Sequence, residues 1–351
     1  MNNLIRIMAG ALCAVLVLAA CTKNDPADQD QRVPLVFHAL SQTADVKAGE
    51  GTNAFPYDNF GIWGIARKSG ESDSDYVLWE AAALTQVDKV TVGSTTAYKP
   101  VDDAYWVSGY TYHFIGLAPF TADGKAASTP IIGTDRPIEP TFSTNSGDAM
   151  TFSYDLSGNY TAGNYTFDLM AAVAEATVTG SASSHTSSQR LTFWHLFSKI
   201  NINVAFKDGA NTFTGTVDKV RLQMDKDVSY TISFNAEKQL NVATDAGAMN
   251  QAEVTFAKSE STNAVPASLH IVPQASANMR LFLDYTIGSG ENSFSLKDIE
   301  VNLSAAGTPA TYGYNESYNW NITIGPKEDI SFKVTVASWD EQQVGNDIVI
   351  P

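Results

Sequence analysis

Cysteine is nearly absent from this 351-residue chain, which contains only Cys13 and Cys21. Both lie within the first 21 residues, so the part of the chain that follows can form no disulfide between its own residues and no cysteine-ligated metal site. The stability of that part must therefore come from packing.

Basic residues are few, with 22 Lys and Arg against 38 Asp and Glu and a formal net charge of −16. Phosphate binding depends on clustered Lys and Arg, so we expect no nucleic-acid partner. The acidity is typical of a protein kept soluble outside the cell, and cation binding is the minor alternative. The 44% hydrophobic and 11% aromatic content excludes disorder and indicates a globular chain.

Local catalytic and metal-binding motifs are missing from the sequence. No two of the five histidines have the H-E-x-x-H spacing, and the G-x-S-x-G, Walker and dinucleotide-binding glycine motifs do not occur. We therefore predict no catalytic residue, no metal and no cofactor, and a protein that is not an enzyme. Two carboxylates that meet across a sheet, as in a glycosidase, are the distant alternative.

The first 20 residues have the pattern of a signal peptide. Arg6 supplies the positive start, an apolar run of about 14 residues follows, and Leu18-Ala19-Ala20 precedes Cys21. This run is shorter than the roughly 20 residues of a membrane-spanning helix. The end resembles the lipobox of bacterial lipoproteins, which implies lipidation of Cys21 and anchoring in the cell outer membrane. An ordinary secretory signal is the alternative, and residues 21–32 are predicted to form an acidic tether.

Short alternating or apolar runs, bounded by Gly, Asn, Asp, Ser and Pro, recur from Val33 onward. This pattern predicts the strands of an antiparallel sandwich or barrel. Residues 191–199 are predicted as a strand with a bend, and Gly288 begins a hairpin turn. The other predicted strands are 33–40, 60–67, 76–80, 110–117, 169–179, 200–206, 219–223, 231–234, 269–273, 279–287, 299–301, 318–324 and 330–337.

A serine-rich segment at 180–188 has the composition of a flexible linker and lies near the middle of the chain. It predicts two domains, at residues 33–186 and 187–351. His195 lies in an aromatic run and is predicted to be a hydrogen-bonded core histidine rather than a ligand. The six tryptophans are predicted to lie mostly in the core, although exposed aromatics could stack on sugar rings.

Several segments in order along the chain resemble the fimbrillins of Bacteroidetes, the subunits of type V pili, and among them the Mfa-like branch. The segments are the lipobox, 34–39, 59–64, Tyr105-Trp106 before 112–119, 167–172, 191–200, 318–324 and 330–339. The resemblance implies an all-β fold of two tandem transthyretin-like antiparallel β-sandwich domains. It also implies a surface-exposed subunit of a fimbrium, whose partners are other pilus subunits and host or bacterial surface ligands.

The resemblance further implies assembly by donor-strand exchange, in which a protease cuts the loop after the first strand and a strand of another subunit replaces it. Leu35 and Phe37 would then mark the pockets of the exchanged strand. The loop 41–55 contains Lys47 and lacks the arginine after which the best-known members are cut. Lys47 and Arg32 are the candidate cleavage residues. Arg32 precedes the strand, and an ordinary tether charge is the favoured interpretation for it.

The tail 340–351 is the candidate donor strand, through Val344, Ile348, Val349 and Ile350. We expect the first strand to pair beside the last, so that its loss opens an edge. The alternative function is a surface glycan-binding lipoprotein of a nutrient-uptake system.

Overall fold

The protein is described by a computed structural model, and its fold is almost entirely β, as predicted. Among the residues that the structure describes, one short helix, α2 (Ser157–Thr161), and two 3-10 turns, η3 (Ser276–Asn278) and η4 (Gly290–Asn292), interrupt the strands. No helix in the described ranges is long and apolar enough to cross a membrane. The structure describes residues 33–42, 52–68, 75–79, 84–92, 94–120, 140–144, 148–161, 163, 165–179, 188–208, 210–245, 251–257, 265, 268–303, 308–326, 330–337 and 339.

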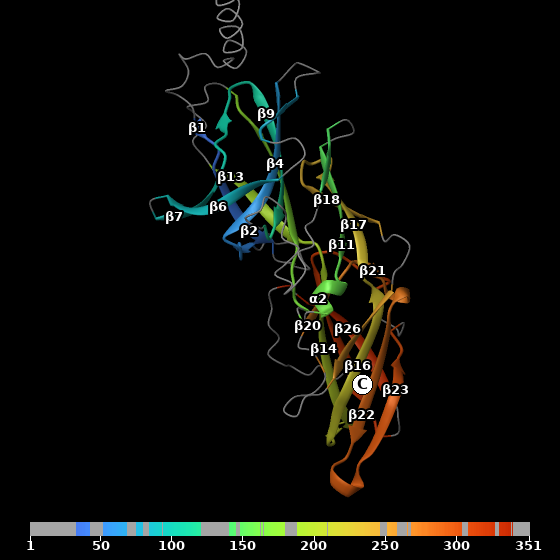
Figure 1. Ribbon diagram of the computed structural model, residues 1–351. Helices are drawn as coiled ribbons and strands as arrows, with labels where there is room; N and C mark the ends of the chain where they lie inside the picture. Colours follow the sequence, from blue (N-terminus) through green and yellow to red (C-terminus); the bar gives the residue numbers. More distant parts are fainter. Residues whose placement is uncertain are drawn as a thin grey trace, which may run out of the picture.

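The N-terminal sheet closes on itself into a barrel (Figure 1). Its first strand, β2, pairs with β7 on one side and with β13 on the other, which completes the ring. The β2–β13 pair is parallel, whereas the other neighbours in the ring are antiparallel. The ring order is β13 (Gln189–His195), β12 (Met170–Thr177), β9 (Tyr110–Ala118), β4 (Asn59–Lys68), β6 (Thr85–Val92), β7 (Thr95–Pro100) and β2 (Phe37–Gln42).

Short strands complete the barrel. β3 (Thr52–Ala54) pairs with β2, β5 (Asp75–Val77) pairs with β4, and β1 (Val33–Pro34) pairs with β8 (Tyr105–Trp106). Alternate side chains along each strand point inward. The interior is rich in aromatic rings, and Phe60 and Phe193 pack with their ring centroids 5.1 Å apart.

The C-terminal half is a sandwich of two sheets with one shared core, formed by the second half of the chain in Figure 1. One sheet has the order β15 (Asn211–Thr212), β14 (Ser198–Asp208), β25 (Glu316–Ile324) and β26 (Ile330–Ala337), with β20 (Ser268–Ile271) paired to β14. The other has the order β19 (Gln251–Ala257), β16 (Gly215–Asp225), β22 (Arg280–Ile287) and β23 (Phe294–Val301). β21 (Gln274–Ala275) pairs with β24 (Thr311–Tyr312).

A third sheet, which we call the bridging sheet, joins the barrel to the sandwich. It has the order β10 (Thr141–Ser143), β11 (Ala149–Asp155), β17 (Asp227–Phe234) and β18 (Leu240–Asp245). Only Lys226 separates β16 from β17, so the chain passes from the sandwich into this sheet almost without a break. Trp63 of barrel strand β4 stacks on Phe142 of β10, with centroids 5.1 Å apart. The bridging sheet therefore packs on the outer face of the barrel.

The strands with strong alternation form close to where they were predicted. The segment 191–199 contains the predicted bend, because β13 ends at His195 and β14 begins at Ser198. Gly288, at φ +86°, begins the connection of the β22–β23 hairpin, as predicted. The predicted strand 33–40 forms as two pieces, β1 and β2. Of the predicted strand 76–80, residues 76 and 77 belong to the short β5, and residue 80 lies outside the described residues.

Strand pairing crosses the serine-rich segment 180–188. Strands on either side of the serine-rich segment pair with each other, because Ala171 of β12 lies opposite Trp194 of β13. β11, from before that segment, pairs along its length with β17, from after it. Residues 180–187 themselves lie outside the described residues.

The expectation that the first strand pairs beside the last is wrong. β26 pairs with β25, whereas β2 lies between β13 and the strands β7 and β3. β2 is thus an internal strand that closes the barrel rather than an edge strand of the sheet that contains β26.

The packing of the barrel core predicts that two phenylalanine-to-alanine substitutions differ strongly in their effect on the free energy of unfolding. Phe193→Ala removes a fully buried ring and should lower the free energy of unfolding by about 3–5 kcal/mol, because a cavity remains. Phe294→Ala, at a ring that is 46% exposed on β23, should cost under about 1 kcal/mol. Urea denaturation of both variants measures this difference, and equal losses would contradict the packing described here.

Candidate functional site

The first strand carries an apolar stripe that lies inside the barrel. Leu35, Phe37, Ala39 and Ser41 are 1%, 0%, 5% and 4% exposed, while the residues between them are half-buried. Phe37 meets Phe60 and Phe114 edge-on, at centroid distances of 6.2 and 5.1 Å. The stripe belongs to the aromatic core of the barrel, and we call the space it fills the seat of β2.

The backbone of β2 is paired on both sides. Residues 37–41 lie opposite 189–193 of β13, and the Gln189 N–H donates to the Val36 carbonyl at 2.8 Å. On the other side Phe37 lies opposite Tyr98, and residues 40–42 lie opposite β3. Loss of the strand would leave unpaired N–H and C=O groups on both neighbours, together with an open apolar groove.

The structure places the predicted pocket residues Leu35 and Phe37 in the barrel core. The other predicted site residues, Cys21, Arg32, Lys47, Val344, Ile348, Val349 and Ile350, lie outside the described residues. Lys47 nevertheless falls in the connection between β2, which ends at Gln42, and β3, which begins at Thr52. A cut at Lys47 would therefore separate β2 from the rest of the chain.

Trp339, which precedes the tail 340–351, is buried at the edge of the main core, where it contacts two histidines and a lysine. It is 4% exposed, and its ring stacks on that of His195 with centroids 4.1 Å apart and planes 15° apart. The His270 ring lies 4.8 Å away, and Lys199 Nζ donates to the Trp339 carbonyl at 2.7 Å. Trp339, the residue before the tail, is thus held beside the end of the barrel strand β13.

The two histidines beside Trp339 have defined partners. His195 Nδ1 lies 2.6 Å from Asp168 Oδ2, and the backbone N–H of His195 donates to Asn315 Oδ1 at 3.2 Å. The predicted hydrogen-bonded core histidine is therefore confirmed. His270 Nδ1 lies 2.8 Å from the Phe167 carbonyl, and burial lowers the pKa of His270 to about 4. His270 is neutral at pH 7 and donates from Nδ1 to that carbonyl.

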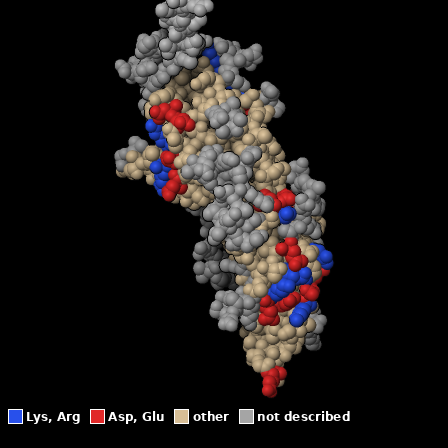
Figure 2. Space-filling model, viewed as in Figure 1, with Lys and Arg blue, Asp and Glu red and all other residues tan. Residues whose placement is uncertain are grey.

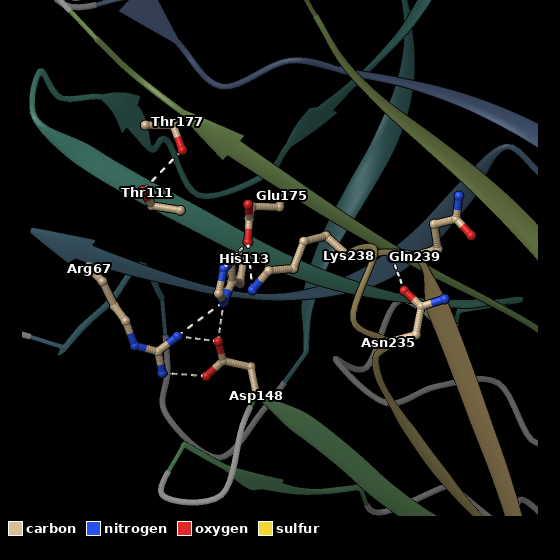
Figure 3. A network of polar contacts seen from close by, with 9 residues as sticks. All are labelled: Arg67, Thr111, His113, Asp148, Glu175, Thr177, Asn235, Lys238 and Gln239. Carbon is tan, nitrogen blue, oxygen red and sulfur yellow. Dashed lines mark hydrogen bonds and ion pairs between the residues drawn. The ribbon is translucent and has the colours of Figure 1, made fainter. Parts of the chain in front are cut away.

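A charged network joins the barrel to the bridging sheet (Figure 3). Arg67 of β4 donates from Nη2 to Asp148 Oδ1 at 2.6 Å, and the Asp148 carboxylate also contacts His113 of β9. His113 Nε2 lies 2.7 Å from Glu175 of β12, and Lys238 Nζ lies 3.3 Å from the same carboxylate. Three adjacent barrel strands are thus tied to the start of β11 and to the β17–β18 turn.

Asp148 is the buried centre of this network, with a side chain that is 1% exposed. Burial acts to raise its pKa, but the hydrogen bonds and charges of Arg67 and His113 outweigh burial and lower the pKa. The carboxylate is therefore ionised at neutral pH and paired. Sequence reasoning missed this network, although Glu175, the one charged residue in the strand 170–177, was a signal for it.

The described residues show no concentration of exposed tryptophans or metal ligands, nor of basic side chains on the face shown in Figure 2. Trp63, Trp106, Trp320 and Trp339 are buried, and Trp79 and Trp194 are half-buried, so the tryptophans form no broad sugar-binding face. Among the described residues, no group of three or more His, Cys, Asp and Glu is placed to hold a metal ion. Figure 2 shows acidic and basic side chains intermixed on the visible face, with no large basic field.

The network around Asp148 predicts that Asp148→Asn lowers the stability of the fold by an amount that depends on pH. At pH 7 this substitution should lower the free energy of unfolding by about 1–3 kcal/mol, because Arg67 and His113 lose an ionised partner. The lowered pKa stabilises the fold above pH 3.8, so the difference from wild type should shrink as the pH falls below that value. Asp58→Asn, in an exposed pair with Lys89, is the control and should change little. A difference that does not vary with pH would contradict this account.

The buried His270 predicts a second effect of pH on stability, between pH 6.5 and about 4. Because its pKa falls from 6.5 to about 4 on folding, the unfolded chain binds the proton first. Stability should therefore decrease as the pH falls from 6.5 to 4, by up to about 3 kcal/mol. His270→Gln should remove this part of the pH dependence in chemical denaturation, whereas His38→Gln, at a half-buried position of β2, is the control. An unchanged slope in the His270 variant would refute the assignment.

A protein-family profile and a solved structure match most of this chain. The fimbrillin-like family profile matches residues 47–339. A fimbrial protein from Bacteroides vulgatus has a TM-score of 0.51 at 15% identity, over 88% of this chain and 99% of that one, which indicates the same fold.

Two further solved structures are similar over comparable lengths. A candidate cell adhesion protein from Bacteroides uniformis has a TM-score of 0.47 at 15% identity, over 89% of this chain and 99% of that one. A fimbrial assembly protein from Parabacteroides distasonis has a TM-score of 0.39 at 12% identity, over 87% and 99%. No curated protein sequence matches. Because the family profile covers most of the chain, the chain belongs to the fimbrillin-like family.

Proposed function

We propose that this chain is a surface-exposed structural or adhesive subunit of a pilus, lipid-anchored to the outer membrane through Cys21 and joined to other subunits by strand exchange. Membership of the fimbrillin-like family supports a pilus subunit. The proposed role is mechanical rather than enzymatic. Adhesion to host or bacterial surfaces would be a property of the assembled fimbrium.

The observation that carries the proposal is the construction of β2. The strand has its apolar stripe in the barrel core and its backbone paired on both sides. Its link to the following strand is residues 43–51, which include Lys47. A single cut there would convert a closing strand into a ligand held only by non-covalent contacts.

The vacated seat would favour a replacement strand for two physical reasons. Main-chain N–H and C=O groups on β13, β7 and β3 would need new partners, and the apolar groove would be open to water. An incoming strand satisfies both, which is the physical basis of strand addition. A cut at Arg32 would not act in this way, because Arg32 precedes β1 and the seat would stay filled.

The tail 340–351 is the proposed donor segment, through Val344, Ile348, Val349 and Ile350. Trp339 supports this role because its contacts with His195 and Lys199 hold the residue immediately before the tail in place. A donor segment with a fixed base loses less freedom on binding than one that hangs from a long loose end.

The proposal predicts that Lys47→Ala blocks assembly. In cells that produce the wild-type chain, gold-labelled antibodies should mark filaments in electron micrographs, and mass spectrometry should find a fragment that ends at Lys47. The Lys47→Ala chain should reach the surface uncut, and the antibodies should not label filaments in these cells.

Arg32→Ala is the matched control for that experiment. It removes the other candidate cleavage residue but leaves the connection between β2 and β3 unchanged, so filaments should form as in wild type. Normal filament labelling with the Lys47→Ala chain, or labelling lost only with Arg32→Ala, would refute the proposed cut.

A further inference from the structure

We infer that the seat of β2 selects a strand with an aromatic side chain at the position of Phe37 and a small one at the position of Ala39, so that the donor strand comes from a different subunit rather than from the tail 340–351 of a second copy of this chain. This inference rests on the proposed strand exchange. It concerns which partner the seat accepts.

The pocket of Phe37 is shaped for an aromatic ring. Phe60 and Phe114 both meet Phe37 edge-on, with interplanar angles of 76° and 85°. Tyr98 lies opposite Phe37 on β7, and its ring also packs against Phe60 at 5.5 Å. Edge-to-face contacts of this kind add to the energy of area burial, and an aliphatic side chain cannot reproduce them.

The next pocket along the stripe is small. Ala39 is 5% exposed and lies opposite Leu191 of β13, which is fully buried. A larger side chain at this position would have to displace packed core atoms, which destabilises a close-packed interior. The seat therefore accepts an apolar, an aromatic and a small side chain at alternate positions of one strand, as Leu35, Phe37 and Ala39 supply them.

The tail of this chain does not carry that pattern. Residues 340–351 read DEQQVGNDIVIP and contain no aromatic side chain. If the tail ran opposite to β2, Ile350, Ile348 and Asn346 would fall at the three pockets. Ile348 would underfill the aromatic pocket, and Asn346 would bury an amide in an apolar one.

The same-direction register is no better. Val344, Asn346 and Ile348 would then fall at the three pockets, which places the Asn346 amide among aromatic rings and a branched side chain at the position of Ala39. Both of these registers of residues 340–351 cost packing and bury a polar group, and no other register supplies an aromatic side chain, because the segment contains none. The seat and the tail of this chain are thus suited to different partners.

Peptide exchange into the cut chain tests this inference. The chain from residue 22 onward receives a specific protease site within residues 43–51 and is cut there, so that both pieces stay together as folded. A fluorescent peptide of residues 33–42 is then added, and its incorporation is followed by anisotropy. Competitors are the unlabelled 33–42 peptide, its Phe37→Ile, Ala39→Asn and His38→Ala variants, and the 340–351 peptide.

The expected order of competition follows from the pockets. The unlabelled 33–42 peptide should compete, and His38→Ala should match it because His38 lies on the face away from the stripe. Phe37→Ile and Ala39→Asn should each weaken competition about tenfold or more. The 340–351 peptide should fail to compete at concentrations that saturate the native sequence.

Two contrary outcomes are distinguishable. If the 340–351 peptide or the Phe37→Ile peptide competes as well as the native sequence, the selectivity is refuted while strand exchange stands. If no peptide enters the cut chain, including the native 33–42 sequence, β2 is not removable, and the proposed function fails together with this inference.

Discussion

The parallel pairing of β2 with β13 is the contact on which the barrel depends. It joins the first strand of the ring to the last one in sequence, with the other ring strands and part of the bridging sheet between them along the chain. Such a contact closes a very long loop. The loss of chain entropy is therefore large, and burial of side chains and strand pairing must offset it. The stripe of Leu35, Phe37 and Ala39 provides that burial.

The barrel core and the main core are separate clusters, which limits what strand exchange would disturb. Leu35, Phe37 and Ala39 belong to the aromatic cluster inside the barrel. A second, larger cluster runs from the outer face of β4 and β9 through the bridging sheet into the sandwich, and it contains none of these three residues. The network around Asp148 ties the barrel wall to the bridging sheet on that outer side. An empty seat would therefore expose one core and leave the other packed.

β13 connects the two segments that the proposed assembly uses. Residues 189–193 border the seat of β2, and His195 at the end of the same strand stacks on Trp339, where the tail begins. The seat of β2 and Trp339 thus contact neighbouring parts of one short strand. In the proposed assembly, the mismatch between the seat and residues 340–351 would give each end of the subunit a different partner, which suits an ordered assembly of unlike subunits better than a uniform polymer.

The sequence by itself determined the strands whose side chains alternate strongly, the bend between β13 and β14, the turn at Gly288 and the core position of His195. These features depend on neighbours within a few residues, because a strand that is buried on one face shows a period of two in its own sequence. β11 has this period through Met150, Phe152 and Tyr154 and could have been predicted, whereas β6 and β18 are too polar to show it clearly.

Only the tertiary structure decided which strands pair. The assignment of β13 to the barrel and of β11 to the bridging sheet depends on which apolar faces meet, and alternation along one strand does not encode its partner. For the same reason no local pattern brings together Arg67, His113, Asp148, Glu175 and Lys238, since these charges come from five separate places in the chain. Closure of the ring by β2, and with it the seat that the proposed function uses, is a property of the folded chain alone.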